Sequence, residues 1–266
     1  MNIFLRELRA SLKSLVIWSG IVVLFVYVGF SKFSAYYGNP EMLAVLDALP
    51  PAMLSAFGIG SGMANLTTLI GFYQIMVTYF ALILGIAAAM WGSDIISKEE
   101  REKTVEYSLT LPVTRTRVVI AKTAAVLVNC IVLLFVTWGI TIVSAQNYSP
   151  DGEFYDYLKI SILAYFLIQL IFLALGIFLG CTIKKYKRAG SLAVSILLGT
   201  YFASVLAGMS KDMEFLKYFT PFKYFDPVQM LRDSGLELSY VLLSVAIIVV
   251  LGVGAFFTYQ KRDLYI

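Results

Sequence analysis

The densest group of charged side chains is the stretch SKEEREKTVEYSLTLPVTRTR, residues 97–117, which lies between two long apolar runs. Carboxylate, ammonium and guanidinium groups at this density can fit a partner's charged groove or simply remain in water. Acid–base or metal chemistry is a poorer match, because the chain contains no histidine, the commonest metal ligand and general base. The stretch therefore indicates either a docking surface for a soluble partner or a solvated loop whose charges only set the topology.

Six apolar runs must position this stretch. The chain of 266 residues is 59% hydrophobic and 14% charged, with a mean hydropathy of +0.81, whereas soluble domains carry about 25% charged residues. A helix needs about 20 apolar residues to cross a bilayer. We therefore predict an all-α integral membrane protein whose single domain, residues 1–266, has six transmembrane helices, at Leu15–Phe30, Leu69–Trp91, Val118–Ala145, Ile160–Thr182, Ala189–Met209 and Tyr240–Tyr259.

Six spans place both termini on one side of the membrane. That side carries 15 basic and 7 acidic residues, a net charge of +8, while the other side carries 6 basic and 10 acidic residues, a net charge of −4. Basic residues favour the cytoplasmic side. The termini and residues 97–117 are therefore predicted to be cytoplasmic, in a multi-pass protein of the cell membrane, and the overall charge of +4 gives no indication of nucleic-acid binding.

The central portions of the spans contain no ionisable side chain except tyrosine hydroxyls, and Asp94 and Lys122 are expected at cytoplasmic ends, where they reach water. Ion-coupled transporters normally bury acids or bases at membrane depth, and an intramembrane enzyme needs a nucleophile with a base, or metal ligands. The sequence therefore disfavours an enzyme. The remaining polar residues are predicted to form hydrogen bonds between helices or, alternatively, to line a cargo path: Gln74, Asn129, Thr137, Thr141 and Gln169.

The first 13 residues form an amphipathic pattern that predicts a helix lying in the inner interface of the membrane. Its polar face holds Arg6, Glu7, Arg9 and Lys13. Its apolar stripe holds Phe4, Leu5, Leu8 and Leu12.

Residues 210–239 are rich in aromatic side chains next to a span, a pattern typical of an interfacial or re-entrant segment. The segment is predicted to be either a simple membrane anchor or an outer gate, with four candidate gate residues: Phe215, Tyr218, Phe219 and Phe222.

The charged stretch itself is predicted to fold as a helix–turn–helix. Asp94 to Thr110 contains no Gly or Pro, so the second span should continue out of the membrane as a helix. Pro112 stops that helix, and Thr114 is a suitable N-cap for the next one. The chain has no G-x-x-x-x-G-K-[ST] motif of its own, because GIGSG, residues 58–62, has no lysine.

The segment ISKEEREKTVEYSLTLPVTRTRVVIAK, residues 96–122, resembles the signature of the permease subunits of ATP-binding-cassette type-2 exporters. The family pattern has an acidic pair before a Thr, then a Leu-x-x-Pro-type turn, a small hydroxylic residue, an Arg and a later Lys. Lys103 replaces the usual Gly before the Thr. Residues 46–58 and 257–266 also fit, and the matching positions are Glu99, Glu100, Thr104, Leu109 to Pro112, Thr114, Arg115 and Lys122.

The resemblance implies two six-span subunits working with two cytoplasmic ATPases, which would bind ATP and Mg, while this chain would bind no cofactor. The second permease would be another copy of the chain or a paralogue. Gly176 and Gly180 could serve that contact or packing within one subunit. KKYKR would supply a second, smaller cytoplasmic contact through Lys184, Lys185 and Lys187. A coupling helix would contact the ATPase through Glu99, Glu100, Arg101, Thr104, Pro112, Thr114 and Arg115, braced by the N-terminal helix.

An apolar, aromatic-rich path suits an amphipathic cargo such as an antimicrobial or cytolytic peptide, or a hydrophobic molecule. Two alternatives remain open. The chain could sense a peptide and signal without transport, or it could be a sodium or drug efflux permease, of which sodium export is the poorer match to spans without buried charges.

Overall fold

The computed structural model describes residues 3–35, 37–39, 50, 66–102, 114–183, 186–209 and 211–261. This part of the chain is helical, without strands. In chain order its helices are α1 (Ile3–Phe33), α4 (Leu69–Glu102), α6 (Arg115–Ala145), the 3-10 turn η1 (Gln146–Tyr148), α7 (Gly152–Thr182), α8 (Tyr186–Met209), the 3-10 helix η2 (Lys211–Phe219), α9 (Pro221–Tyr224), α10 (Pro227–Arg232) and α11 (Leu238–Lys261).

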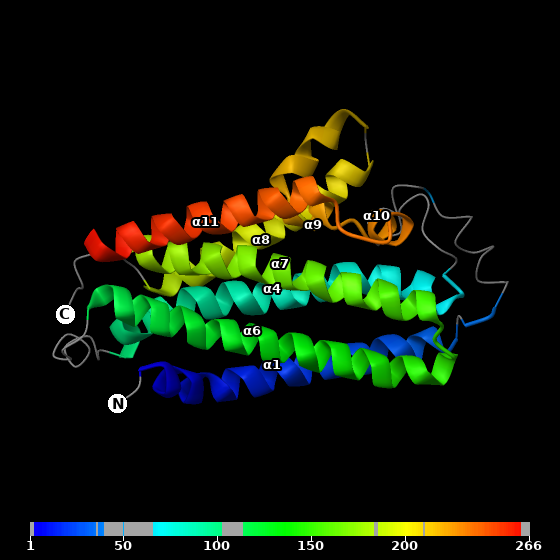
Figure 1. Ribbon diagram of the computed structural model, residues 1–266, viewed down its shortest axis with the longest axis horizontal. Coiled ribbons are helices and arrows are strands. Elements are labelled where there is room, and N and C mark those ends of the chain that lie inside the picture. The colour runs from blue at the N-terminus through cyan, green and yellow to red at the C-terminus, as the bar shows by residue number, and fades with distance from the viewer. Residues whose placement is uncertain are drawn as a thin grey trace.

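Six of these helices are long and apolar enough to cross a membrane, which confirms the predicted number of spans. They are α1, α4, α6, α7, α8 and α11, and they run side by side along the length of the molecule (Figure 1). At several ends the helices continue beyond the predicted spans into polar sequence. The prediction of a separate interfacial helix before the first span is not confirmed, since Ile3–Phe33 is one continuous helix.

The start of α1 and the end of α11 lie at the same end of the bundle (Figure 1). The same end holds the end of α4, the start of α6 and the start of α8. We call this the basic end, after Lys98, Lys122, Arg188 and Lys261. The other end, with η1, α10 and the start of α7, is called the opposite end.

The α4–α7 pair forms the centre of the bundle, and these two helices make the most extensive contact in the molecule. Glycine allows their backbones to approach closely. A Cβ atom on Gly92 would lie 2.5 Å from the Leu173 carbonyl oxygen, and one on Gly176 would collide with the carbonyl of Ala89. A Cβ atom on Gly180 would lie 3.0 Å from the Ser93 carbonyl oxygen. Gly176 and Gly180 therefore serve packing within the chain, and the alternative that they join two subunits is wrong.

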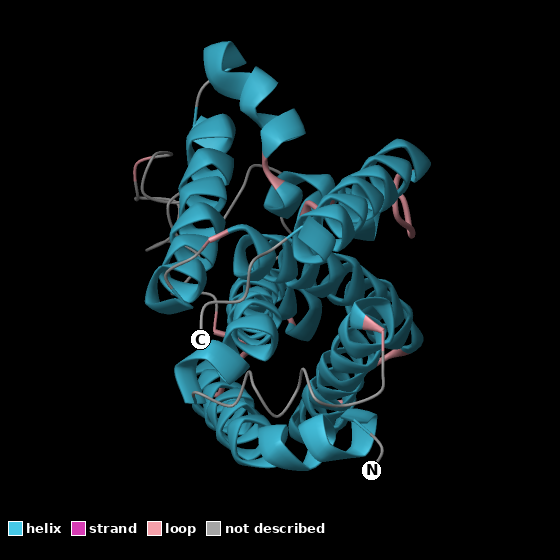
Figure 2. Cartoon of the chain, turned by 90° about the vertical axis from the view of Figure 1, so that its left-hand side faces the viewer, coloured by secondary structure: helices cyan, strands magenta, loops and turns pink. Residues whose placement is uncertain are grey.

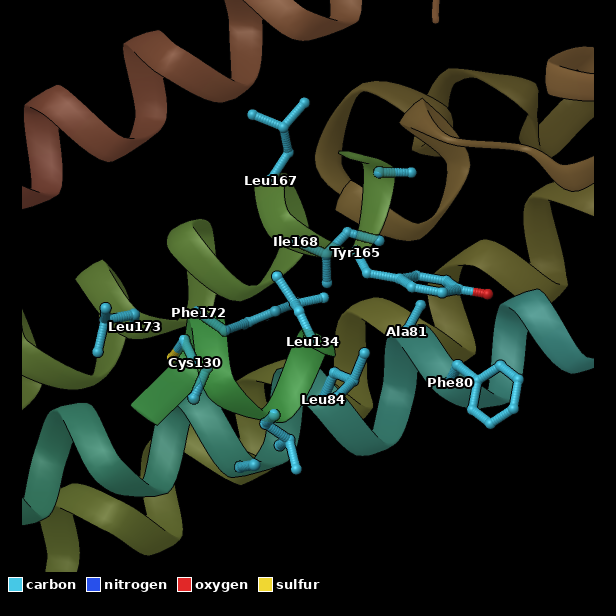
Figure 3. Packing of buried hydrophobic residues seen from close by; sticks show 14 of the residues in the cluster. Phe80, Ala81, Leu84, Cys130, Leu134, Tyr165, Leu167, Ile168, Phe172 and Leu173 are labelled. Atoms are coloured by element: carbon cyan, nitrogen blue, oxygen red, sulfur yellow. The ribbon is translucent and has the colours of Figure 1, made fainter. Parts of the chain in front are cut away.

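Apolar side chains from α4, α6 and α7 fill the space between these helices (Figure 3). Leu84 of α4, Leu134 of α6 and Phe172 of α7 point toward one another there, and Cys130 lies beside them. Both cysteines, Cys130 and Cys181, are buried, and neither forms a disulfide. This core sets α4 rigidly between its neighbours.

The remaining spans pack around the centre. α1 lies mainly against α6, α8 lies against α4, and α11 lies against α7. Figure 2 views the bundle from its basic end. α8 and α11 are the least buried spans, so most of their apolar surface is available to lipid or to another subunit.

Candidate functional site

Residues 103–113 are flanked by the end of α4 and the start of α6. α4 continues as a helix to Glu102, well past the predicted end of the span at Trp91. Thr114 is the N-cap of α6, because its hydroxyl oxygen accepts a hydrogen bond from the Arg117 backbone N–H at 3.3 Å. The predicted helix beyond Trp91 is therefore found as far as Glu102 and the predicted cap is confirmed, while the predicted stop at Pro112 lies outside the described residues.

Between these two helix ends lies a group of charged side chains, Arg6, Glu7, Lys98 and Lys122, which we call the ionic cluster. Glu7 of α1 is only 3% exposed. One of its carboxylate oxygens accepts bonds from the Arg6 guanidinium at 2.8 and 3.1 Å. The other lies 3.4 Å from the Nζ atom of Lys98 on α4. The prediction that Glu7 lies on a polar outer face is therefore wrong.

Lys122 of α6 completes the ionic cluster and is 1% exposed. Its Nζ atom donates a hydrogen bond to the Ile95 carbonyl oxygen of α4 at 3.0 Å, and its charge acts on Glu7. The expectation that Lys122 reaches water is wrong. A buried ammonium needs both a hydrogen-bond acceptor and an opposite charge. Here α4 supplies the acceptor, the Ile95 carbonyl, and α1 supplies the opposite charge, that of Glu7.

A neutral hydrogen bond joins α1 and α4 about two turns deeper than the Glu7–Lys98 pair. The indole N–H of Trp91 on α4 donates to the Ser14 hydroxyl oxygen on α1 at 2.8 Å. Three polar links therefore join α1, α4 and α6 at the basic end: Glu7–Lys98, Ser14–Trp91 and Lys122–Ile95. Together they fix the ends of the two helices that flank residues 103–113.

The predicted coupling residues are only partly covered by the structure. Glu99, Glu100 and Arg101 belong to the last turns of α4, and Arg115 is the first residue of α6. Thr104 and Pro112 lie outside the described residues.

In the second predicted contact, Lys187 is in the first turn of α8. Lys184 and Lys185 lie outside the described residues. Their predicted role stays a prediction.

The apolar stripe of the first helix faces outward. Leu5 is 47% and Leu12 48% exposed, while Phe4 and Leu8 are half-buried. The stripe is thus placed to contact lipid even though it belongs to the same helix as the first span.

The four candidate gate residues do not form one group. Phe215, Tyr218 and Phe219 of η2 are exposed, whereas Phe222 of α9 is 7% exposed. The Phe222 ring lies 5.6 Å, centroid to centroid, from both Phe172 of α7 and Tyr201 of α8. Phe222 is therefore a packing residue, and including it in an exposed gate was wrong.

The polar residues of the spans behave in different ways. Gln74 donates to the Pro227 carbonyl oxygen at 3.4 Å and so joins α4 to α10, as predicted. Thr137 instead bonds to the Leu133 carbonyl of its own helix. The described part of the chain offers no hydrogen-bond partner to the side chains of Asn129, Thr141 and Gln169, so their predicted interhelical bonds are not found.

Next to the ionic cluster is a cavity of about 790 Å³ between α1, α4 and α8. We call it the serine pocket, because Ser14, Ser93, Ser97, Ser191 and Ser195 line it together with Asp94. Asp94 is exposed there, as expected for an acid that reaches water.

Sequence reasoning missed the ionic cluster and the pocket, although each left a signal. Glu7 is the sole acid among four charged residues of the first 13. Lys122 stands alone in the apolar run VVIAKTAAV. An isolated charge in an apolar segment indicates a buried partner.

The fold and the site define a class: a multi-pass helical membrane protein with a fixed pair of helix ends at its basic end and a polar pocket beside them. The whole length supports a narrower assignment, since residues 1–264 match the family model for the ABC-2 family transporter protein. The chain therefore belongs to the ABC-2 transporter family and is a transmembrane transporter subunit. Permeases of this family normally work in the membrane with an ATP-binding subunit. A search of curated proteins found no match to the chain.

Proposed function

We propose that this chain is the membrane permease of an ATP-driven exporter and that it works as a dimer with separate ATPase subunits docked at its basic end. The observation that carries the proposal is the ionic cluster, which fixes α4 and α6 on both sides of residues 103–113. Burying the charged groups of Glu7 and Lys122 is costly unless their geometry is well satisfied. Such a cost is understandable where the position of two helix ends has to be held against a moving partner.

The packing of α4 supports the same proposal. Its glycine-mediated contact with α7 makes it a stiff rod, and its last turns carry Glu99, Glu100 and Arg101. A push received at those residues would be passed along α4 into the centre of the bundle. Charged side chains suit such a contact, because complementary charges fix the register with a partner's groove.

The first experiment tests the docking surface. The tagged chain is purified from its native membrane, and a co-purifying ATPase with a P-loop is identified and reconstituted with it. The double variant Glu99→Lys/Glu100→Lys should weaken ATPase association, because it reverses the acidic pair. We expect the free energy of unfolding to change by no more than about 0.5 kcal/mol, as is usual for surface substitutions. Asp156→Asn at the opposite end serves as the control.

A second variant separates binding from coupling. Pro112→Ala removes the residue that stops the helix, so the segment re-aims while its charges stay. ATPase association should persist while hydrolysis no longer drives export. Normal export by both variants would mean that residues 97–117 only set the topology, and absence of any co-purifying ATPase would favour a sensing protein instead.

The proposed orientation, in the cell membrane with the basic end in the cytoplasm, is tested by thiol labelling. Gly152→Cys should react from outside the cell, whereas Tyr186→Cys should react only after permeabilisation. Labelling of Tyr186→Cys in intact cells would overturn the orientation.

The proposed cargo is an amphipathic peptide or another amphipathic, hydrophobic molecule. Exposed apolar faces on α1, α8 and α11 suit such a molecule better than a sugar. Export assays with reconstituted vesicles, comparing an amphipathic cationic peptide with sodium, would distinguish peptide from ion export.

A further inference from the structure

The serine pocket lies in the half of the bundle nearest the basic end. Asp94 is eight residues before the end of α4, which corresponds to about 12 Å along the helix. Ser14 of α1 and Ser191 of α8 reach the same level from the other two helices. The volume of about 790 Å³ is within the range of sites that hold drug-sized ligands, about 300–1,000 Å³.

Two hydroxyl groups of this pocket, those of Ser93 and Ser97, are better acceptors than donors. Ser93 donates its proton to the Met90 carbonyl oxygen at 3.0 Å, and Ser97 donates to the Ser93 carbonyl. Ser14 already accepts from Trp91. A serine oxygen whose proton is committed to the backbone offers only lone pairs to a ligand.

The charge of the pocket lining also favours a ligand that donates hydrogen bonds and carries a positive charge. Among the described residues that line the pocket, Asp94 is the charged one. Asp94 is exposed on the pocket wall, whereas Glu7 is buried in the ionic cluster. Trp18 and Trp91 also line the pocket and supply aromatic surface, which attracts cations.

We propose that the serine pocket binds the protonated amine of an amphipathic molecule, with Asp94 as the counter-ion and the serine oxygens as hydrogen-bond acceptors. The apolar part of the ligand would extend along Met90 and Val194 toward the exposed side chains Val16, Ile17 and Leu192. This inference rests on the proposed function, because it names the chemical group that the exporter would recognise in its cargo. A cavity of this size suits an organic cation better than a bare metal ion.

The test measures binding by the purified chain in phosphatidylcholine nanodiscs, without an ATPase. The probe is dansylcadaverine, an amphipathic primary amine, and its N-acetylated form is the matched neutral ligand. Fluorescence polarisation, corrected for empty nanodiscs, should show about tenfold tighter binding of the amine than of the acetylated form. Asp94→Asn should abolish that difference, Asp94→Glu should retain it, and Asp156→Asn should leave it unchanged.

Several outcomes would overturn the proposal. One is equal binding of the two probes to the unmodified chain, which needs no variant and so does not depend on how Asp94→Asn folds. Another is unchanged amine binding in a folded Asp94→Asn protein. Displacement of the probe by low-millimolar sodium, with potassium inert, would assign the pocket to the ion. Because no ATPase is present, amine binding without ATPase docking would overturn the proposed function alone, and docking without amine binding would overturn this proposal alone.

Discussion

The two ends of the bundle are joined by different chemistry. At the basic end, charged and hydrogen-bonded groups connect α1, α4 and α6 through Glu7, Lys98 and Lys122. At the opposite end, aromatic rings connect α1 with α4 and with η1, the turn that follows α6. The Phe33 ring of α1 stacks on Phe72 of α4, with centroids 4.4 Å apart and planes at 15°. It also lies 4.9 Å from the Tyr148 ring of η1.

The difference follows from what each type of contact can do. Aromatic pairs gain energy over a range of tilted and stacked geometries, so the opposite end can adjust to small movements. Buried ion pairs are favourable only with good geometry and full hydrogen bonding, so the basic end has one preferred arrangement. A subunit that receives a signal at its basic end needs its fixed arrangement there.

The largest effect in this comparison is expected from Phe33→Ala. Phe33 is fully buried, and removing a ring of this kind costs about 3–5 kcal/mol in protein interiors. The loss should not depend on salt, because no charge is involved. Cys130 and Cys181 are both buried and become accessible when the chain unfolds. A dye that becomes fluorescent when it reacts with a thiol therefore measures the unfolding temperature during heating. Phe215→Ala, an exposed ring on η2, is the control and should leave the temperature unchanged.

A somewhat smaller effect is expected from Glu7→Gln. This change leaves Lys122 buried beside a neutral partner, which should cost about 3 kcal/mol, the low end for breaking a buried pair, since Arg6 and Lys98 retain contact with water. The same thiol-reactive dye measures this loss of stability. The exposed pair of Asp156 and Lys159 supplies the control, because Asp156→Asn should cost less than about 1 kcal/mol. Equal losses from Glu7→Gln and Asp156→Asn would contradict the view that the basic end depends on buried charge.

The two stability variants should also differ in function. Glu7→Gln should impair coupling in the reconstituted complex more than Phe33→Ala does, once both are assayed at a temperature where they are folded. The measurement is the ratio of export rate to ATP hydrolysis. If the two variants gave the same ratio, the ionic cluster would have only a structural role.

The smallest effect is expected from Tyr157→Phe at the opposite end. The Tyr157 hydroxyl donates to the Pro227 carbonyl oxygen at 3.0 Å and ties α7 to α10. Losing one such bond typically costs about 1 kcal/mol. The carbonyl can retain a bond from Gln74, so the double variant with Gln74→Leu should lose more than the sum of the single changes. An additive result would mean that the two donors act independently.

Much of the fold could be predicted because its causes are local. A span is set by the length of an apolar run, so all six were found. Thr114 was identified as an N-cap because the cap bond reaches only three residues along the chain. The continuation of α4 beyond Trp91 to Glu102 agrees with the absence of Gly and Pro from Asp94 onward.

The candidate site was harder to predict because its parts meet from distant segments. Glu7, Lys98 and Lys122 are far apart in the sequence, and only the packing of α1 against α6 and α4 brings them together. Phe222 was grouped with Phe219 by position, although one is buried between α7 and α8 and the other is exposed. The serine pocket consists of residues from three helices, none of which is unusual alone.

The sequence by itself determined the six helices, the excess of basic residues on the side of the termini and the membership of the ABC-2 family. The tertiary structure decided which face of each helix turns inward. A helical pattern separates a polar face from an apolar one, but in a membrane the apolar stripe of Leu5 and Leu12 faces outward while Glu7 faces in. Lipid is as apolar as leucine, so the solvent no longer selects the inward face. That choice depends on finding a partner for each charge, and the partners are on other helices.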